Sequence, residues 1–594
     1  MKTFKKTLAA FLAVLMIFSS CVIFSFAADE NSAYVENFDT ETPVIIVHGM
    51  SQNNTYLLDE NGEWATNDDG KYITGWPLHI EIPALLETAL APLIKSIFLR
   101  KDAGLSDALY QAAYDALYVI QKDNEGNYIH DVEVPCYECP MSELSEEVKA
   151  EYYGFLPIQE LSQIVGEDMV YYFGYDSIGD VIYETEKLHH YIHDVVLPQT
   201  GASQVKLCHI SLGGTIAVNY LENYPEDYEL IKKIVFVVPA IDGSNIIGDL
   251  LINNLSVYDD SVLYENLLVS LLGETPLAYI LNMALRILPS DVLKSALEGL
   301  AGGVVNVAAR TSTMLWALCP TEYYEEAKAI WLEGDEYALV RSKVDSFMKA
   351  RANFEENLFE LRDSGAELFD VACYDVPLFP LCKDYQKTNA DRVIHAASPS
   401  MGATFADLGT TLGEDYVAAG TYCSDPTHNH LSPDGVVDAT TGLLPCTTWY
   451  FKGQAHELLP HNDVALELAI HAMTDSNIKD VYSNPAYPQF NNGRITRDTN
   501  AMIKAWNEAD QSKVSAKDKA EIEAAIADVK ALEEETIVDI EAWTAAEDAL
   551  EDALSGAGIV ESSKPSQLDK VFTSFAKVAN RAVNSVFNIL DLEK

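Results

Sequence analysis

The sequence is poor in basic residues, with 39 Lys and Arg against 91 Asp and Glu, and its formal net charge is −52. So acidic a chain repels phosphate backbones, which excludes a nucleic-acid-binding protein. No apolar run after the N-terminal one is long enough to suggest a membrane span. Hydrophobic residues make up 48% of the chain, which excludes a mainly disordered protein. The 594 residues indicate more than one domain, or one catalytic domain with insertions.

The N-terminus resembles an export signal. Three lysines precede an apolar run over residues 8–26, and Ser25 and Ala27 provide the small residues of a cleavage site. We therefore expect a secreted, extracellular protein whose residues 1–27 are removed. An uncleaved membrane anchor stays open because the run approaches spanning length, and Cys21 leaves a lipoprotein signal open.

Eight cysteines follow this segment. They are Cys136, Cys139, Cys208, Cys319, Cys373, Cys382, Cys423 and Cys446. An even number in an exported protein permits disulfides, but the sequence does not choose among the pairings. Cys136 and Cys139 form a lone CxxC, which favours a local disulfide or two free thiols over zinc, and Cys208 lies in an apolar strand as a buried thiol. The sequence predicts no cofactor and no metal site.

Short β-branched runs alternate with helical segments along much of the chain. The runs occupy residues 43–50, 169–175, 204–210, 231–238, 368–374 and 447–452. Helical segments at 178–197 and 213–223 lie between them. Because apolar strands that alternate with helices form parallel sheets covered on both faces, we predict an α/β fold.

Three segments depart from this alternation. Residues 245–361 hold successive apolar helices and predict a helical cap inserted into a catalytic domain of residues 28–498. The composition then shifts to Ala, Glu, Lys and Asp, which predicts a separate all-helical region at 499–594. Residues 57–76 carry Asn-Gly and Asp-Gly pairs that predict a β-hairpin, and its acidic residues lack EF-hand spacing.

Ser211 stands where a predicted strand runs directly into a glycine-opened helix. Such a turn strains the serine backbone and presents its hydroxyl at the carboxyl edge of the sheet, beside a helix N-terminus that stabilises an oxyanion. Ser211 is therefore the candidate nucleophile. His209 stands where a small residue normally relieves crowding, so an ordinary strand-to-helix turn stays open.

The first predicted strand ends in His48 and Gly49, at the same edge of the sheet. An oxyanion hole needs two N–H groups that converge on one oxygen. We predict the backbone amides of Met50 and Leu212 as this pair, with an ordinary strand-ending turn as the alternative.

A serine nucleophile needs a base and an orienting acid, which follow it in the order acid, then histidine. His456, in the loop after the last predicted strand, is the candidate base, with His461 as its rival. Asp434, in a turn before that strand, is the candidate acid, with Asp438 and then Asp425 as alternatives. The remaining late histidines are interpreted as structural or exposed: His395, His428, His430 and His471.

Four segments together resemble an α/β-hydrolase of the lipase and esterase kind: VIIVHGM (44–50), HISLGG (209–214), PDGVV (433–437) and FKGQAH (451–456). The third is similar to the acid turn of bacterial lipases and lecithin-cholesterol acyltransferase-like enzymes. The resemblance covers about residues 40–475. It implies an α/β-hydrolase fold, a Ser-His-Asp triad and an acyl-enzyme formed from carboxylic esters, including acyl lipids. The cap would then be a lid over an acyl pocket.

Two other functions stay open: an amidase or peptidase on the same triad, and an inactive hydrolase fold that serves as a binding protein. Residues 522–532 with Trp543 are similar to small helical repeats of bacterial surface proteins. Residues 567–590 form an amphipathic stretch that either packs into the helical tail or contacts lipid or the cell envelope. The expected partner is thus an ester or lipid substrate.

Overall fold

The computed structural model describes residues 34–77, 82–256, 262, 275–286, 288–492, 496–533, 540–560, 573 and 576–581. The predicted signal segment lies outside these residues, as does most of the amphipathic stretch at 567–590.

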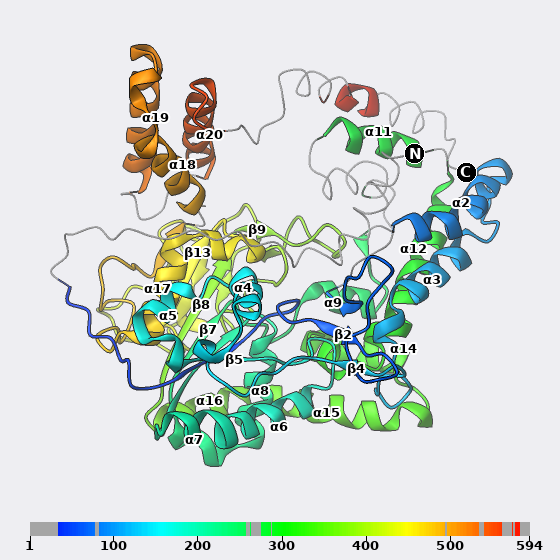
Figure 1. Cartoon of the computed structure of the whole chain (residues 1–594), viewed down its shortest axis with the longest axis horizontal. Coiled ribbons are helices and arrows are strands. Elements are labelled where there is room, and N and C mark those ends of the chain that lie inside the picture. Colours follow the sequence, from blue (N-terminus) through cyan, green and yellow to red (C-terminus); the bar gives the residue numbers. More distant parts are fainter. Residues whose placement is uncertain are drawn as a thin grey trace.

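A seven-stranded sheet forms the centre of the molecule (Figure 1). Its strands, in spatial order, are β5 (Val170–Phe173), β1 (Val44–Val47), β6 (Val205–Ile210), β7 (Ile231–Val237), β8 (Glu367–Tyr374), β13 (Thr448–Lys452) and β14 (Phe490–Asn492). Every neighbouring pair is parallel. This confirms the expected parallel α/β sheet, and β14 is a strand that the sequence analysis did not predict. The chain crosses from β5 back over β1 to β6, so the carboxyl ends of β1 and β6 lie side by side at a topological switch point.

Helices cover both faces of the sheet because successive strand residues point to opposite sides. Ile45 and Val47 pack into one core, and Val44 and Ile46 pack into the other. The helices of the first core include α6 (Val181–His190), α8 (Gly213–Asn223), α13 (Thr313–Trp316), α15 (Ala338–Ala352) and α16 (Phe354–Asp363). Those of the second are α4 (Glu146–Phe155), α5 (Gln159–Val165) and α17 (Asp463–Thr474).

The segment expected as a cap divides into two parts. Its last helices, α15 and α16, pack on α8 and so belong to the helical layer of the sheet domain. The helices of this segment that come before α15 include α9 (Asn245–Leu251), α11 (Pro276–Leu285), α12 (Ser290–Val304) and α14 (Tyr324–Trp331). The α12 helix continues into η9 (Val305–Ala309), and α13 lies between η9 and α14. The α12 helix packs along α3 (Leu105–Ala116), next to α2 (Ile82–Leu99), and Figure 1 shows these three helices together.

The helix Ser290–Ala309 is the one stretch among the described residues with the length and composition of a membrane span. About half of its apolar window, 56%, is buried inside the protein, and core helices of globular proteins pass the same test. The α12 helix packs on α3, and the end of the helix in η9 packs into the first core of the sheet domain.

Three small sheets decorate the domain. Antiparallel β2 (Thr55–Leu57) and β3 (Thr74–Trp76) confirm the predicted hairpin, and β4 (Val132–Glu133) adds to it. The others pair β9 (Val376–Pro377) with β10 (Asn389–Ala390), and β11 (Thr404–Phe405) with β12 (Val437–Asp438).

The C-terminal helices have a core of their own. They are α18 (Thr496–Glu508), α19 (Ala516–Glu533) and α20 (Ile540–Gly556). Trp506, Ile522 and Trp543 are buried together in this core. The α18 helix begins three residues before the predicted start of the helical region at residue 499, and it contacts α17, where the Asn500 side chain donates a hydrogen bond to Asp463 (2.7 Å).

Candidate active site

Ser211 lies at a sharp turn between β6 and α8, as the sequence predicts. Its φ of +52° is in the left-handed region, which is strained for a residue with a side chain. The turn is held by its backbone: the Ser211 N–H donates to the Val237 carbonyl, and the Ser211 carbonyl accepts from the N–H groups of Gly214 and Ala240, each at 2.9 Å. These bonds hold the backbone of Ser211 in this strained conformation.

Gly213 lets the start of α8 approach the end of β1. A Cβ on this residue would lie 2.5 Å from the Val47 carbonyl oxygen, so no other residue fits without moving the strand. His209, which replaces the usual small residue before the serine, turns away from the site. It is buried, and its Nδ1 is 2.8 Å from the Gly213 carbonyl oxygen. Burial lowers the pKa of His209 to about 4, so the ring is neutral and donates this bond.

His456 is the first residue of the helical turn η13 (His456–His461), which follows β13. Its Nε2 lies 2.9 Å from the Ser211 Oγ, and its Nδ1 lies 2.7 Å from a carboxylate oxygen of Asp391. The His456 N–H also donates to the Asp391 carbonyl (2.8 Å). The ring is therefore held between a hydroxyl and a carboxylate, in the arrangement that activates a serine.

Asp391 is the acid that the sequence analysis missed. It is fully buried, and its second carboxylate oxygen accepts from the N–H groups of Val393 and Ile394 at 3.0 and 2.7 Å. The bonds to one oxygen leave the other directed at His456. Asp391 directly follows β10 in the long connection after β8, and it satisfies the same chain order of serine, acid and histidine. The chain order restricts the acid to residues between Ser211 and His456. No local motif distinguishes Asp391 from the other acidic residues in that range.

The structure corrects the choice of Asp434. Its carboxylate accepts from the Ser432 and Tyr374 hydroxyls and pairs with Lys452 at 3.1 Å, so it ties the turn before β12 to the sheet and does not contact His456. Burial opposes ionisation, but the bonds from Ser432 and Lys452 outweigh it and hold the pKa of Asp434 below its usual range.

The remaining alternatives also lie apart from the histidine ring. Asp438 caps the turn after β12 and accepts from Thr440 and Tyr416, whereas Asp425 is an exposed turn residue bound to Thr427. His461 ends η13 and lines the neighbouring cavity, and the Ser211 hydroxyl donates its hydrogen bond to His456 instead.

Met50 and Leu212 flank Ser211 as predicted. Neither backbone N–H has a hydrogen-bond acceptor among the residues that the structure describes, which leaves both free to bind an oxygen of a ligand. The N–H of Gly49, one residue earlier, is occupied by the Gln52 side chain at 2.6 Å. The predicted role of Met50 and Leu212 as the oxyanion pair stays a prediction.

His48 supports the loop that carries Met50. Its Nδ1 is 2.6 Å from the Gly49 carbonyl oxygen, and its ring stacks on Tyr175. Burial lowers the pKa of His48 to about 3, so the ring is neutral and donates to that carbonyl. The Tyr175 hydroxyl in turn donates to the His48 carbonyl (2.6 Å). These contacts fix the end of β1 opposite the serine turn.

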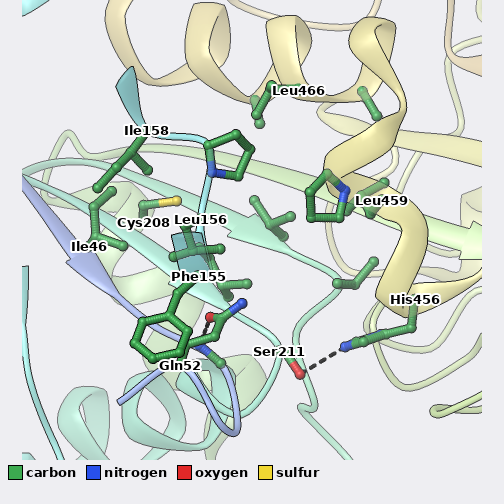
Figure 2. A pocket seen from close by; sticks show the side chains of 18 of the residues that line it. Ile46, Gln52, Phe155, Leu156, Ile158, Cys208, Ser211, His456, Leu459 and Leu466 are labelled. Atoms are coloured by element: carbon green, nitrogen blue, oxygen red, sulfur yellow. Dashed lines mark hydrogen bonds between the residues drawn. The ribbon is translucent and has the colours of Figure 1, made fainter. Parts of the chain in front are cut away.

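Two apolar cavities meet at Ser211. The larger, about 420 Å³, lies between η13, α5 and α17, and Figure 2 shows Ser211 and His456 beside its apolar side chains, among them Ile46, Leu156 and Leu466. The smaller, about 100 Å³, lies under α9 and η9. Met50 and Ser211 line both, so a reacting carbon at the serine would have an apolar space on either side.

Burial and the Asp391 carboxylate act in opposite directions on the pKa of His456. Burial lowers the pKa of the imidazole, but the facing Asp391 carboxylate, with a smaller contribution from Glu457, outweighs burial and raises the pKa above its ordinary value. Protonated His456 cannot accept the serine proton. Turnover should therefore fall as the pH is lowered, with an inflection above the ordinary histidine value of about 6.5.

This prediction is checked by measuring kcat/KM for a soluble ester across the pH range. Glu457→Gln removes the smaller charge that raises the pKa, so its inflection should move slightly down while turnover at alkaline pH persists. An inflection of the unmodified protein below 6.5 would contradict the assigned partner of His456.

Comparisons with known proteins add little to this geometry. No family model matches the chain, and no curated protein matches it. Among solved structures, the chain is similar to one described as "The crystal structure of Tle4-Tli4 complex", with 14% identity, 56% of this chain and 74% of that chain covered, and a TM-score of 0.23. A likeness of this size carries no argument about function. The fold itself is a parallel α/β sheet with helices on both faces.

Proposed function

We propose that the chain is an exported serine hydrolase of the α/β-hydrolase type that cleaves carboxylic esters through Ser211, His456 and Asp391. The observation that carries this proposal is the pair of hydrogen bonds on either side of the His456 ring, to Ser211 and to Asp391. Export rests on the composition of residues 1–27.

The positions of the three residues in the sheet support the α/β-hydrolase assignment. The serine and the histidine follow the carboxyl ends of the parallel strands β6 and β13, and the acid follows β10 in the long connection that leaves the carboxyl end of β8. The positive φ of Ser211, between a strand and a helix, is the nucleophile turn expected of that fold.

In the proposed reaction, the neutral Nε2 of His456 accepts the Ser211 proton as the serine oxygen attacks the ester carbonyl carbon. The carbonyl oxygen becomes an oxyanion, which the N–H groups of Met50 and Leu212 stabilise. Asp391 stabilises the imidazolium, which then protonates the departing alkoxide. Water attacks the resulting acyl-enzyme with His456 as the base, releases the carboxylic acid and restores the serine.

The two cavities define the expected substrate class. Each is lined mainly by apolar side chains, so apolar groups on both the acyl and the alcohol side of the ester would leave water when the substrate binds. The larger cavity has room for an acyl chain of several carbons. These features favour lipid-like esters over charged substrates.

An alkyl fluorophosphonate tests the proposal directly because it phosphonylates an activated serine. The full-length protein should become labelled at Ser211, as located by peptide mass spectrometry, and the labelled protein should no longer hydrolyse p-nitrophenyl esters. An octanoate ester should be turned over with a higher kcat/KM than an acetate. Equal kcat/KM values would contradict the assignment of the larger cavity to the acyl chain.

The two rival functions give different results. A peptidase or amidase would cleave the matched anilides or peptides well above the uncatalysed rate and in a Ser211-dependent manner, whereas an esterase would leave them intact. A binding protein without catalytic activity would show neither labelling nor turnover.

A further inference from the structure

Four potential metal ligands meet beside the start of β13, away from the triad. They are Cys423, His428, His430 and Cys446. We propose that these four side chains bind a structural zinc ion. The sequence alone predicts no metal site and favours a structural or exposed role for both histidines.

Four of the six distances between the ligand atoms match the edges of a zinc tetrahedron, and all six are within 4.8 Å. The Cys423 Sγ lies 3.9 Å from the Cys446 Sγ and 3.5 Å from the His428 Nδ1. The Cys446 Sγ lies 3.8 Å from the same His428 atom and 3.6 Å from the His430 Nε2. With Zn–S about 2.3 Å and Zn–N about 2.0 Å, tetrahedral angles give S–S edges of about 3.8 Å and S–N edges of about 3.5 Å.

The tautomer of His430 is set for coordination by its other ring nitrogen. The Gln489 amide nitrogen donates to the Pro445 and Thr448 carbonyls, which directs its oxygen at the His430 Nδ1 at 2.8 Å. Since that oxygen can only accept, Nδ1 carries the proton and Nε2 presents a lone pair to the cluster. Metal-bound histidines in proteins are commonly oriented by such a second hydrogen bond.

The cluster is enclosed, which suits a structural ion rather than a catalytic one. His430 is 2% exposed, and the other three ligands are partly buried. The Tyr482 ring packs against both histidine rings, with centroids 4.8 Å from His428 and 5.9 Å from His430. Four protein ligands complete a tetrahedral shell, whereas a catalytic zinc keeps one position open for water or substrate.

The site would hold the loop that precedes the last triad strand. Cys423, His428 and His430 belong to a loop with little regular structure, and Cys446 lies two residues before β13. His456 follows the opposite end of that strand. Zinc would thus cross-link the loop to the strand that positions His456, without contact to substrate.

A disulfide between Cys423 and Cys446 is the main competing arrangement in an exported protein. The two sulfur atoms are 3.9 Å apart, whereas a disulfide needs about 2.05 Å, and a disulfide would give the two histidines no role. The lone CxxC at Cys136 and Cys139 offers two possible ligands, whereas the cluster offers four.

The zinc content of the purified full-length chain tests this proposal. Inductively coupled plasma mass spectrometry should find one zinc ion per chain. Cobalt(II) exchanged into the site should give the visible absorption bands of a tetrahedral cobalt–thiolate complex. Removal of the metal by a strong chelator should lower the melting temperature by several degrees, and added zinc should restore it. A metal-free protein that binds no added zinc, or a Cys423–Cys446 disulfide found by peptide mapping, would overturn the proposal.

Variants then locate the site. Cys446→Ser and His430→Ala should lose the bound zinc, whereas the matched control Cys139→Ser should keep it. Gln489→Ala leaves all four ligands in place and should weaken zinc affinity about 10–100-fold in a chelator competition, because the His430 ring loses its orienting partner. Loss of zinc from Cys139→Ser, with retention in Cys446→Ser, would assign the metal to the CxxC pair instead. Unchanged affinity in Gln489→Ala would contradict the assigned role of His430.

Discussion

Ser211→Ala is expected to lower kcat for p-nitrophenyl ester hydrolysis by about 10⁶-fold, in keeping with the loss of a triad serine elsewhere. The reason is that the substitution removes the atom that attacks the carbonyl carbon, and no other hydroxyl can take its place at the turn. The small residual rate would come from the two free amides and the apolar cavities, which still bind the ester. Stopped-flow or endpoint assays at matched protein concentration measure the effect.

The substitution should leave the fold intact because only one oxygen atom is removed and the backbone bonds of the turn remain. Circular dichroism and thermal unfolding check this. Ser203→Ala is the matched control, since Ser203 is an exposed serine before the opposite end of the same strand. Turnover of Ser211→Ala close to that of Ser203→Ala would remove Ser211 from the mechanism.

Asp391→Asn is expected to lower kcat by about 10⁴-fold with little change in the fold. The amide oxygen can still accept from the N–H groups of Val393 and Ile394, so the amide nitrogen then faces His456. Because that nitrogen only donates, it forces Nδ1 to be the acceptor and leaves the ring proton on Nε2. A protonated Nε2 cannot accept the Ser211 proton.

Asp434→Asn is the control for this substitution, and it separates the sequence-based choice from the structural one. Asp434 bonds Ser432, Tyr374 and Lys452 in the turn before β12, so its neutralisation should reduce stability modestly and leave turnover nearly unchanged. If Asp434→Asn were the more damaging of the two, the assignment of Asp391 would be wrong. Unfolding curves for both variants distinguish lost structure from lost chemistry.

Local sequence determined the parts of the site that depend on neighbouring residues. A β-branched run followed by serine and two glycines fixes a strand, a tight turn and a helix start, since each preference acts over a few residues. The same holds for the end of β1, which presents Met50. The sequence also identified His456 as the candidate base, because this histidine lies in the loop directly after the last predicted strand.

The tertiary structure decided which side chains face these elements. Asp391 and His456 are 65 residues apart, and their contact depends on the path of the loop after β8, where no periodicity constrains the chain. The Asp434 turn has a local motif but is directed at Lys452 and Tyr374. The four metal ligands likewise lack a familiar spacing, and they converge only because the loop folds back on the start of β13. Turns and strands depend on interactions between residues that are close in sequence. The partner of a buried imidazole depends on how segments distant in sequence pack against each other.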